Sequence, residues 1–172
     1  MIFTAYADGR FDLAGREVRC ALGRGGVIAV GDKREGDGAS PAGLWPLRRL
    51  LYRPDRGHAP PTALSTRPLA PGDGWCDAPR DDCYNRMVTL PHGAHAESLW
   101  RMDGIYDLIV VVGHNDDPAI SGAGSAIFLH LAREDFAPTQ GCVALARDDL
   151  EALLALAAPG DSLAISFAAE PA

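Results

Sequence analysis

The stretch "SAIFLHLAREDFAPTQGCVALARDDL", Ser125–Leu150, places a histidine at the end of an apolar run and a cysteine twelve residues later. The run "AIFLHL" is typical of a strand buried on both faces, and "VAL" after the cysteine predicts a second, short strand. The intervening segment, Leu131–Gly141, is long enough to return the chain and place Cys142 beside His130. These two residues are either the base and nucleophile of an acyl-transfer enzyme or two buried structural side chains.

The rest of the chain favours a mainly β fold with a few helices, of the α+β class. Residues 1–32 alternate short apolar runs with glycine turns, which predicts successive antiparallel strands. A helix is expected over 150–158, capped by Asp148 or Asp149 and ended by Pro159-Gly160. Further strands are expected at Leu44–Arg53, Tyr106–Asn115, Ala126–Leu131 and Asp161–Phe167.

Length and composition indicate one domain. The chain has 172 residues, enough to bury a core without disulfide or metal staples, and we expect a single domain over 1–172. Its 19 glycines and 13 prolines indicate many turns. Residues 54–104 are rich in Pro, Gly, Asp and His with little periodicity, which predicts a long ordered excursion. Loops of that length in compact domains commonly carry function.

Charge and hydropathy argue against several partners. The net charge of −7 and the scattered arginines disfavour nucleic acid, whose phosphates attract clustered Lys and Arg. No stretch approaches eighteen consecutive apolar residues, so we expect no membrane span. The first twenty residues lack a basic segment followed by an unbroken apolar one, and we recognise no export signal there. The chain also lacks a glycine-rich phosphate-binding loop.

A cysteine nucleophile needs a base. A free thiol has a pKa near 8.5, so only a few per cent is thiolate at neutral pH and a neighbouring group must accept the proton. His130, at the end of a strand, is suited to this role. Gly141, which has no Cβ, allows substrate to approach the backbone, where N–H groups could stabilise an oxyanion. The alternative is that both are ordinary buried residues, since free cysteine is among the most buried residue types.

Two motifs point to a family. "TQGCVAL" after "AIFLH" resembles the signature of the L,D-transpeptidase (YkuD-like) catalytic domain, in which a strand-terminal His precedes a Ser/Thr-x-Gly-Cys element. "DGASPAGLWPL", Asp37–Leu47, is similar to the Thr-Pro-x-Gly-x-Phe segment of that family. The resemblance implies a β-sandwich or open barrel with a long loop excursion and one C-terminal helix. It covers most of the chain outside 54–104.

The resemblance also implies an activity, the exchange of amide bonds in peptidoglycan stem peptides without a metal or other cofactor. Cys142 would be the nucleophile and His130 the general base and then acid, while Gly141 and Cys142 would supply oxyanion N–H groups. Thr139 would support the turn, and Thr139 and Gln140 would contact substrate. The products implied are 3-3 cross-links, and 1-3 links in some relatives. The expected location is the periplasm, where the family substrate lies.

Two departures from the family pattern affect substrate binding. Gln140 stands where the family often has His, and Ala144 where it often has Arg. Arg147 or Arg133 could instead anchor the donor carboxylate. His114, in "GHNDDP" after another strand end, is either a substrate contact or part of a turn.

Other functions remain open. One is a cysteine-dependent hydrolase of peptidoglycan peptides, in which water replaces the acceptor amine. Another is a non-catalytic cell-wall binding module. Outside the motif, Cys76, Cys83, His92 and His95 could form a zinc site, but their spacing is poor and we expect no metal. A Cys76–Cys83 disulfide and two free thiols are the alternatives there.

Overall fold

The computed structural model describes residues 1–167, whereas 168–172, the end of the predicted domain, lie outside the described residues. The described chain is mainly β, as predicted, with one α-helix, α1 (Arg147–Leu156), and one 3-10 turn, η1 (Val30–Asp32). Its strands are β1 (Ile2–Tyr6), β2 (Arg10–Leu13), β3 (Arg16–Ala21), β4 (Val27–Ile28), β5 (Ser40–Pro41), β6 (Gly43–Tyr52), β7 (Thr66–Pro68), β8 (Asp73–Cys76), β9 (Met87–Thr89), β10 (Ala96–Ser98), β11 (Leu108–Val112), β12 (Phe128–Leu131), β13 (Val143–Leu145) and β14 (Ser162–Ser166).

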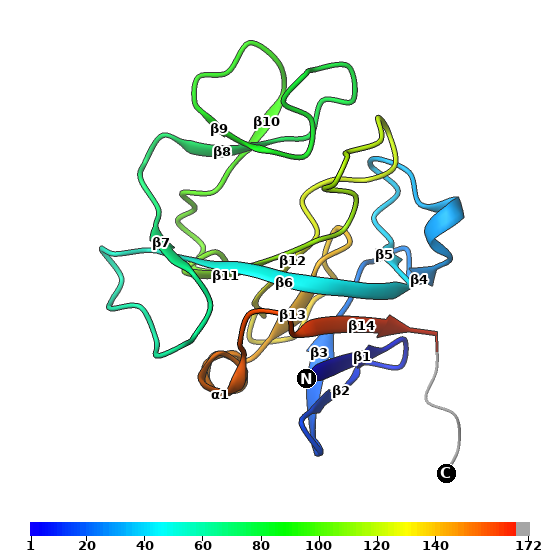
Figure 1. The fold of residues 1–172 in the computed structure, drawn as a ribbon, viewed down its shortest axis with the longest axis vertical. Helices are drawn as coiled ribbons and strands as arrows, with labels where there is room; N and C mark the ends of the chain where they lie inside the picture. Colours follow the sequence, from blue (N-terminus) through cyan, green and yellow to red (C-terminus); the bar gives the residue numbers. More distant parts are fainter. Residues whose placement is uncertain (168–172) are drawn as a thin grey trace.

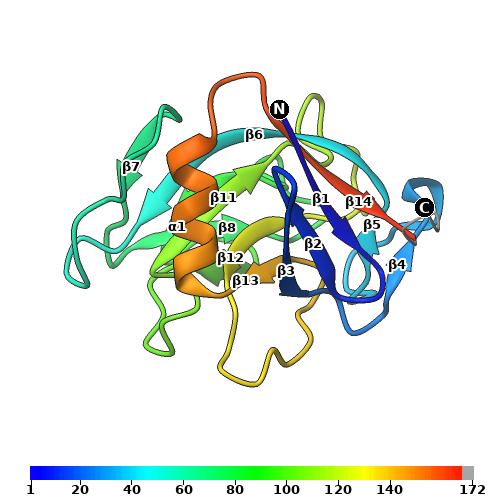
Figure 2. The same ribbon diagram turned by 90° about the horizontal axis from the view of Figure 1, so that it is seen from below.

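The main sheet closes on itself as a barrel (Figures 1 and 2). Its strand order is β11-β12-β13-β3-β2-β1-β14-β6-β7, and β6 also pairs with β11. The long strand β6 makes this closure possible, because its first residues pair with β14 and its later residues pair with β11. Closure leaves few free strand edges, which stabilises the sheet.

Glycine turns connect the first three strands, as the sequence predicts. Gly9 follows β1 and Gly15 follows β2, and both have φ of +89°. A residue with a Cβ is strained in this left-handed region, whereas glycine is not. The chain can therefore reverse within a few residues, and β1, β2 and β3 pair in antiparallel order.

Strand β11 is apolar throughout because both of its faces are covered. All five of its residues are buried. Leu108, Val110 and Val112 belong to the barrel core, whereas Ile109 and Val111 belong to a second apolar cluster outside it. Since neighbouring side chains of a strand point to opposite faces, one apolar run supplies both cores. Strand β12 is also buried along its length, which confirms the prediction of central strands.

The excursion over 54–104 is ordered and contains strands that the sequence did not indicate. Strand β7 pairs with β6, and β8, β9 and β10 form a separate sheet in the order β10-β8-β9. Figure 1 shows this small sheet at one end of the molecule, with α1 and the β1–β3 strands at the other. Trp75 and Leu99 join the second apolar cluster and so attach the small sheet to the outside of β11 and β12.

The start of the helix differs from the prediction. Helix α1 begins directly after β13 with Ala146 as its N-cap, and the Leu150 N–H donates to the Ala146 carbonyl as the first helical hydrogen bond. No side-chain capping bond forms, because alanine has no side-chain acceptor. The expected cap at Asp148 or Asp149 is therefore wrong. Both carboxylates lie in the first turn, where they interact favourably with the helix dipole.

A 3-10 turn also replaces the end of the strand expected to reach Asp32.

The helix packs its leucines on the barrel core. Leu150, Leu153 and Leu154 are fully buried in that core.

Within residues 1–167, no helix has the length and apolar character needed to cross a membrane.

Helix packing can be tested with one pair of substitutions. Leu154 is fully buried, whereas Leu156 of the same helix is 48% exposed. We expect Leu154→Ala to lower the free energy of unfolding by about 2–5 kcal/mol, because it leaves a cavity in the core. Leu156→Ala should change it by less than about 0.5 kcal/mol. Chemical denaturation measures both, and equal effects would contradict this packing.

Candidate active site

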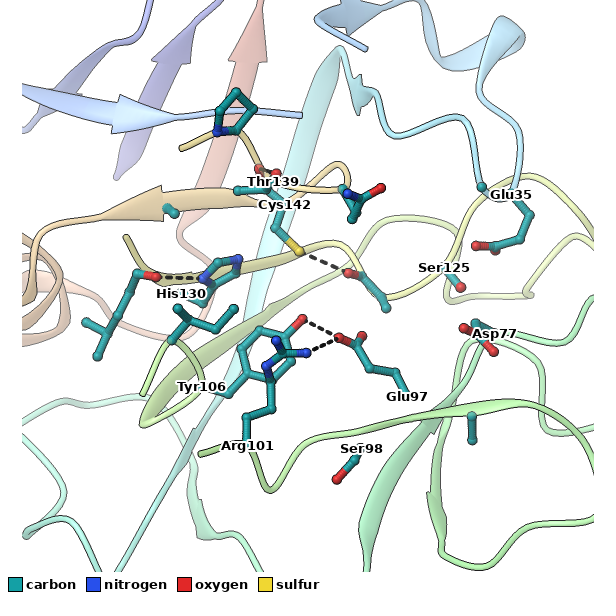
Figure 3. A pocket seen from close by; sticks show the side chains of 18 of the residues that line it. Glu35, Asp77, Glu97, Ser98, Arg101, Tyr106, Ser125, His130, Thr139 and Cys142 are labelled. Atoms are coloured by element: carbon teal, nitrogen blue, oxygen red, sulfur yellow. Dashed lines mark hydrogen bonds and ion pairs between the residues drawn. The ribbon is translucent and has the colours of Figure 1, made fainter. Parts of the chain in front are cut away.

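A cavity of about 670 Å³ lies between the barrel and the small sheet. Cys142 and His130 line it from the barrel, and Glu97 and Ser98 of β10 line it from the small sheet. Figure 3 shows Cys142 and His130 on one side of this space, with Tyr106, Glu97 and Arg101 facing them. The excursion therefore forms one wall of the cavity that holds the predicted pair.

Strand pairing places the cysteine and the histidine on one face. Strands β12 and β13 are parallel, and Leu129 pairs with Val143 while His130 pairs with Ala144. Cys142 therefore lies one step before β13, next to Phe128, whose N–H donates to Sγ at 3.3 Å. Because alternate residues of a strand share a face, His130 and Cys142 point to the same side of the sheet. They lie diagonally across two neighbouring strands.

The turn before Cys142 is held by Thr139 and Gly141. The Thr139 hydroxyl accepts the Gly141 N–H at 3.1 Å and donates to the Cys142 carbonyl at 2.7 Å. Gly141 has φ of +132°, and a Cβ there would stand 2.8 Å from the Ala39 carbonyl oxygen. The Gly141 carbonyl accepts the Ser40 hydroxyl at 2.8 Å. The two sequence motifs thus meet at this turn, and only glycine fits between them.

The Gly141 N–H is engaged within the turn, which bears on its expected role as an oxyanion donor. Its hydrogen bond to Thr139 would have to break before it could bind a substrate oxygen. The Cys142 N–H, by contrast, donates to no acceptor within residues 1–167. Of the two expected oxyanion donors, the Cys142 N–H is the one that is free.

The Cys142 thiol is protonated in the resting protein. Its side chain is 6% exposed, and it donates to the Ala126 carbonyl at 3.2 Å. Burial raises the pKa of this thiol to about 12, against a smaller lowering by the Phe128 N–H. No hydrogen bond joins Sγ to the His130 ring in the part of the chain that the structure describes. The thiol has to turn away from Ala126 before it can give its proton to the imidazole.

The His130 ring is neutral and its tautomer is fixed. Nδ1 lies 2.9 Å from the Leu131 carbonyl oxygen, which can only accept, so Nδ1 carries the proton and Nε2 does not. The Tyr106 ring packs edge-on against the imidazole with centroids 5.2 Å apart. Burial lowers the pKa of His130 to about 4. An unprotonated Nε2 is the form that a general base requires.

Three residues of the opposite wall were not found by sequence reasoning. The Tyr106 hydroxyl donates to Glu97 Oε1 at 2.9 Å, and Arg101 lies 3.7 Å from the same oxygen. Burial raises the pKa of Glu97 and raises that of Tyr106 well above its ordinary value. The sequence marks Tyr106 only as the start of an expected strand and shows no period or motif at Glu97 and Arg101, so nothing there indicated a site. Their proximity to the cysteine is a product of tertiary folding alone.

The remaining predicted site residues divide into two groups. Thr139, Gln140 and Arg133 line the cavity together with Cys142 and His130. His114 and Arg147 do not. Arg147, at the start of α1, pairs with Asp107 at 3.3 Å and with Glu151 at 3.4 Å.

His114 is buried beside the cavity rather than in it. Its ring packs edge-on against Trp45 with centroids 4.7 Å apart, and its Nε2 donates to the Ala123 carbonyl at 3.2 Å. Nδ1 is buried without a hydrogen-bond partner among the described residues. These contacts suit a packed neutral imidazole.

The cavity carries charges of both signs. Cationic Lys33, Arg101 and Arg133 and acidic Glu35, Asp77, and Glu97 all contribute to its lining. A ligand with both amine and carboxylate groups can find partners on these walls.

Comparison with known proteins assigns the chain to a family. The family model described as the L,D-transpeptidase catalytic domain (YkuD) matches residues 2–165. The chain belongs to this family. Among curated proteins, no significant sequence match was found. A solved structure, described as the helical cell shape determining protein Pgp2 from Campylobacter jejuni, is similar with a TM-score of 0.41 and 16% identity. The match covers 98% of this L,D-transpeptidase-family chain and 48% of that one, so the chain spans about half its length.

Buried neutral histidines make stability depend on pH. Burial lowers the pKa of both His114 and His130 to about 4, so the unfolded chain binds more protons than the folded one between about pH 6.5 and 4. Their stabilisation is complete above about pH 6.5 and is lost as the pH falls. Each can contribute a slope of up to about 1.4 kcal/mol per pH unit.

We expect His114→Gln to remove about half of this slope between pH 6.5 and 5, because glutamine keeps a donor without titrating. Chemical denaturation over that pH range measures it. The control is His95→Gln, since His95 is exposed and its pKa is raised by Asp77. If the control abolished the decline as well, the buried imidazoles would not be its source.

Proposed function

We propose that the chain is a cysteine acyltransferase that acts on the stem peptides of peptidoglycan. One observation carries this proposal. Cys142 and His130, whose Nε2 is unprotonated, line one cavity and lie on one face of two paired strands. The family and the dimensions of the cavity support a peptide substrate. Peptidoglycan lies outside the cytoplasmic membrane, so we place the reaction in the periplasm or outside the cell.

The first half-reaction forms a thioester. When a peptide carbonyl enters, Cys142 Sγ leaves the Ala126 carbonyl, passes its proton to His130 Nε2 and bonds to the carbonyl carbon. The Cys142 N–H donates to the oxygen that becomes negative. The C–N bond then breaks, and the leaving amine takes the proton from Nε2. His130 returns to its neutral form with Nδ1–H still on the Leu131 carbonyl.

The second half-reaction decides between transfer and hydrolysis. In transfer, an amine of a second stem gives a proton to His130 Nε2 and attacks the thioester, which restores an amide and the thiol. In hydrolysis, water does the same and the product is a shortened stem. We take transfer as the first choice, because the carboxylates of Glu35, Asp77 and Glu97 along the cavity offer acceptors for the amine of a second stem. The product would be a 3-3 link or a 1-3 link.

Burial keeps the resting pair uncharged. With a thiol pKa of about 12 and an imidazole pKa of about 4, a thiolate-imidazolium pair is disfavoured before substrate binds. Proton transfer is therefore coupled to carbon-sulfur bond formation, where the oxyanion N–H compensates the new charge.

Incubation with purified muropeptides tests this mechanism. We expect Cys142→Ala to abolish product and His130→Ala to lower the rate at least about a hundredfold, the usual scale for a positioned acid-base group. Cys20→Ala is the matched control, because Cys20 is a buried thiol of the barrel core that lies outside the cavity. It should keep full activity.

The products distinguish the candidate functions. Cross-linked dimers indicate transfer, and shortened monomers indicate hydrolysis. Binding of muropeptides with no product, unchanged by Cys142→Ala, would refute catalysis and leave the binding module.

The two candidate carboxylate anchors can be separated. Arg133 lines the cavity and Arg147 is held by Asp107 and Glu151 outside it. We expect Arg133→Ala to raise KM about tenfold or more, the effect of losing one hydrogen bond to a charged group. Arg147→Ala should leave KM unchanged. A larger effect at Arg147 would show that the donor lies elsewhere than in this cavity.

A further inference from the structure

Three side chains with metal-binding atoms meet outside the active-site cavity. They are Cys76 at the end of β8, Asp81 in the loop after it, and His92 between β9 and β10. One ligand atom from each lies within 4.8 Å of the other two. A thiolate, a carboxylate oxygen and an imidazole nitrogen are the three ligand types that zinc takes in proteins. The set considered from the sequence had Cys83 and His95 in place of Asp81, and the poor spacing of those four residues argued against a metal.

The contact between His92 and Asp81 resembles two ligands of one ion more than a hydrogen bond. His92 Nε2 is 3.3 Å from Asp81 Oδ1. It is nevertheless buried without a hydrogen-bond partner among the described residues. In a tetrahedral zinc site, bonds of about 2.0–2.2 Å to nitrogen and oxygen separate those two atoms by about 3.3–3.5 Å. The observed separation fits that edge.

The surroundings are also those of a metal site. The Cys83 N–H donates to Asp81 Oδ1 at 2.7 Å and so orients the carboxylate, as outer partners of metal ligands do. Cys76 is fully buried, whereas His92 lines a surface cavity of about 460 Å³ that gives an ion access from solvent. A thiolate and a carboxylate together carry two negative charges, which balance a divalent cation.

We propose that Cys76, Asp81 and His92 bind a zinc ion that braces the small sheet. On binding, the Cys76 thiol loses its proton to solvent and the sulfur bonds to the metal, with water in the fourth position. This proposal is independent of the acyltransferase chemistry. No ligand of the zinc lines the active-site cavity.

A metal at this place would stabilise a wall of the active site. Strands of three or four residues give a small sheet little stability of its own. The zinc would join the end of β8 to the two loops that flank β9. Cys76 pairs directly with Ala96 of β10, and Ala96 lines the active-site cavity beside Glu97. The ion would therefore hold β10 in position from behind.

Titration of the full chain with Co²⁺ tests the site, because a cobalt-thiolate bond gives a charge-transfer absorption and tetrahedral geometry gives strong visible bands. All proteins carry Cys142→Ser, so that the active-site thiol cannot contribute. We expect one equivalent of Co²⁺ to produce both signals and one equivalent of Zn²⁺ to remove them. Cys76→Ser and His92→Ala should weaken Zn²⁺ binding at least about a hundredfold, since even outer-partner changes cost 10–100-fold.

Matched controls use the neighbouring residues of the same type. Cys83→Ser and His95→Ala should keep the cobalt signals, because neither side chain belongs to the cluster. Asp81→Asn, with circular dichroism to show that it is folded, should weaken binding without loss of structure. Absence of a thiolate signal in the parent protein, or an unchanged signal in Cys76→Ser, would overturn the proposal.

Discussion

The parallel pairing of β12 with β13 is the constraint on which the site depends. It sets His130 opposite Ala144 and leaves Cys142 beside Phe128, so both candidate catalytic side chains point out of the barrel. The pairing is stable because β12 is buried on both faces, by the barrel core and by the second apolar cluster. A slip of one residue would turn one of the two side chains into the barrel interior. Register and chemistry are therefore set together.

The two sides of the cavity differ in charge. On the barrel side, burial keeps the Cys142 thiol and the His130 imidazole neutral. The opposite side carries ionisable groups, among which Glu97 is held by Tyr106 and Arg101. Reactive groups kept without charge do not attract counterions or water, while the polar wall can orient a charged peptide. In the proposed mechanism, charge develops on the sulfur only when a substrate carbonyl is present to accept it.

Sequence reasoning predicted the parts of the structure that rest on local pattern. The glycine turns, the buried runs of β11 and β12 and the family motif around Cys142 are all legible along the chain. The predicted helix cap was wrong because α1 begins directly after β13, and the end of β13 is set by its pairing with other strands. The strands of the small sheet were not found, since three or four residues show no period. Glu97 and Tyr106 were missed for a related reason: Cys142 and His130, which they face across the cavity, lie far from them along the chain.

The excursion also reaches Cys142, through a short chain of hydrogen bonds. Asn85, in the loop between β8 and β9, accepts the Ala126 N–H at 3.0 Å, and the Ala126 carbonyl accepts the Cys142 thiol at 3.2 Å. The same amide accepts the Trp75 indole N–H and donates to the His114 and Asn115 carbonyls. A buried amide with all its bonds made is costly to displace. The loop between β8 and β9 thus helps to fix the resting position of the thiol, together with the Phe128 N–H of the barrel.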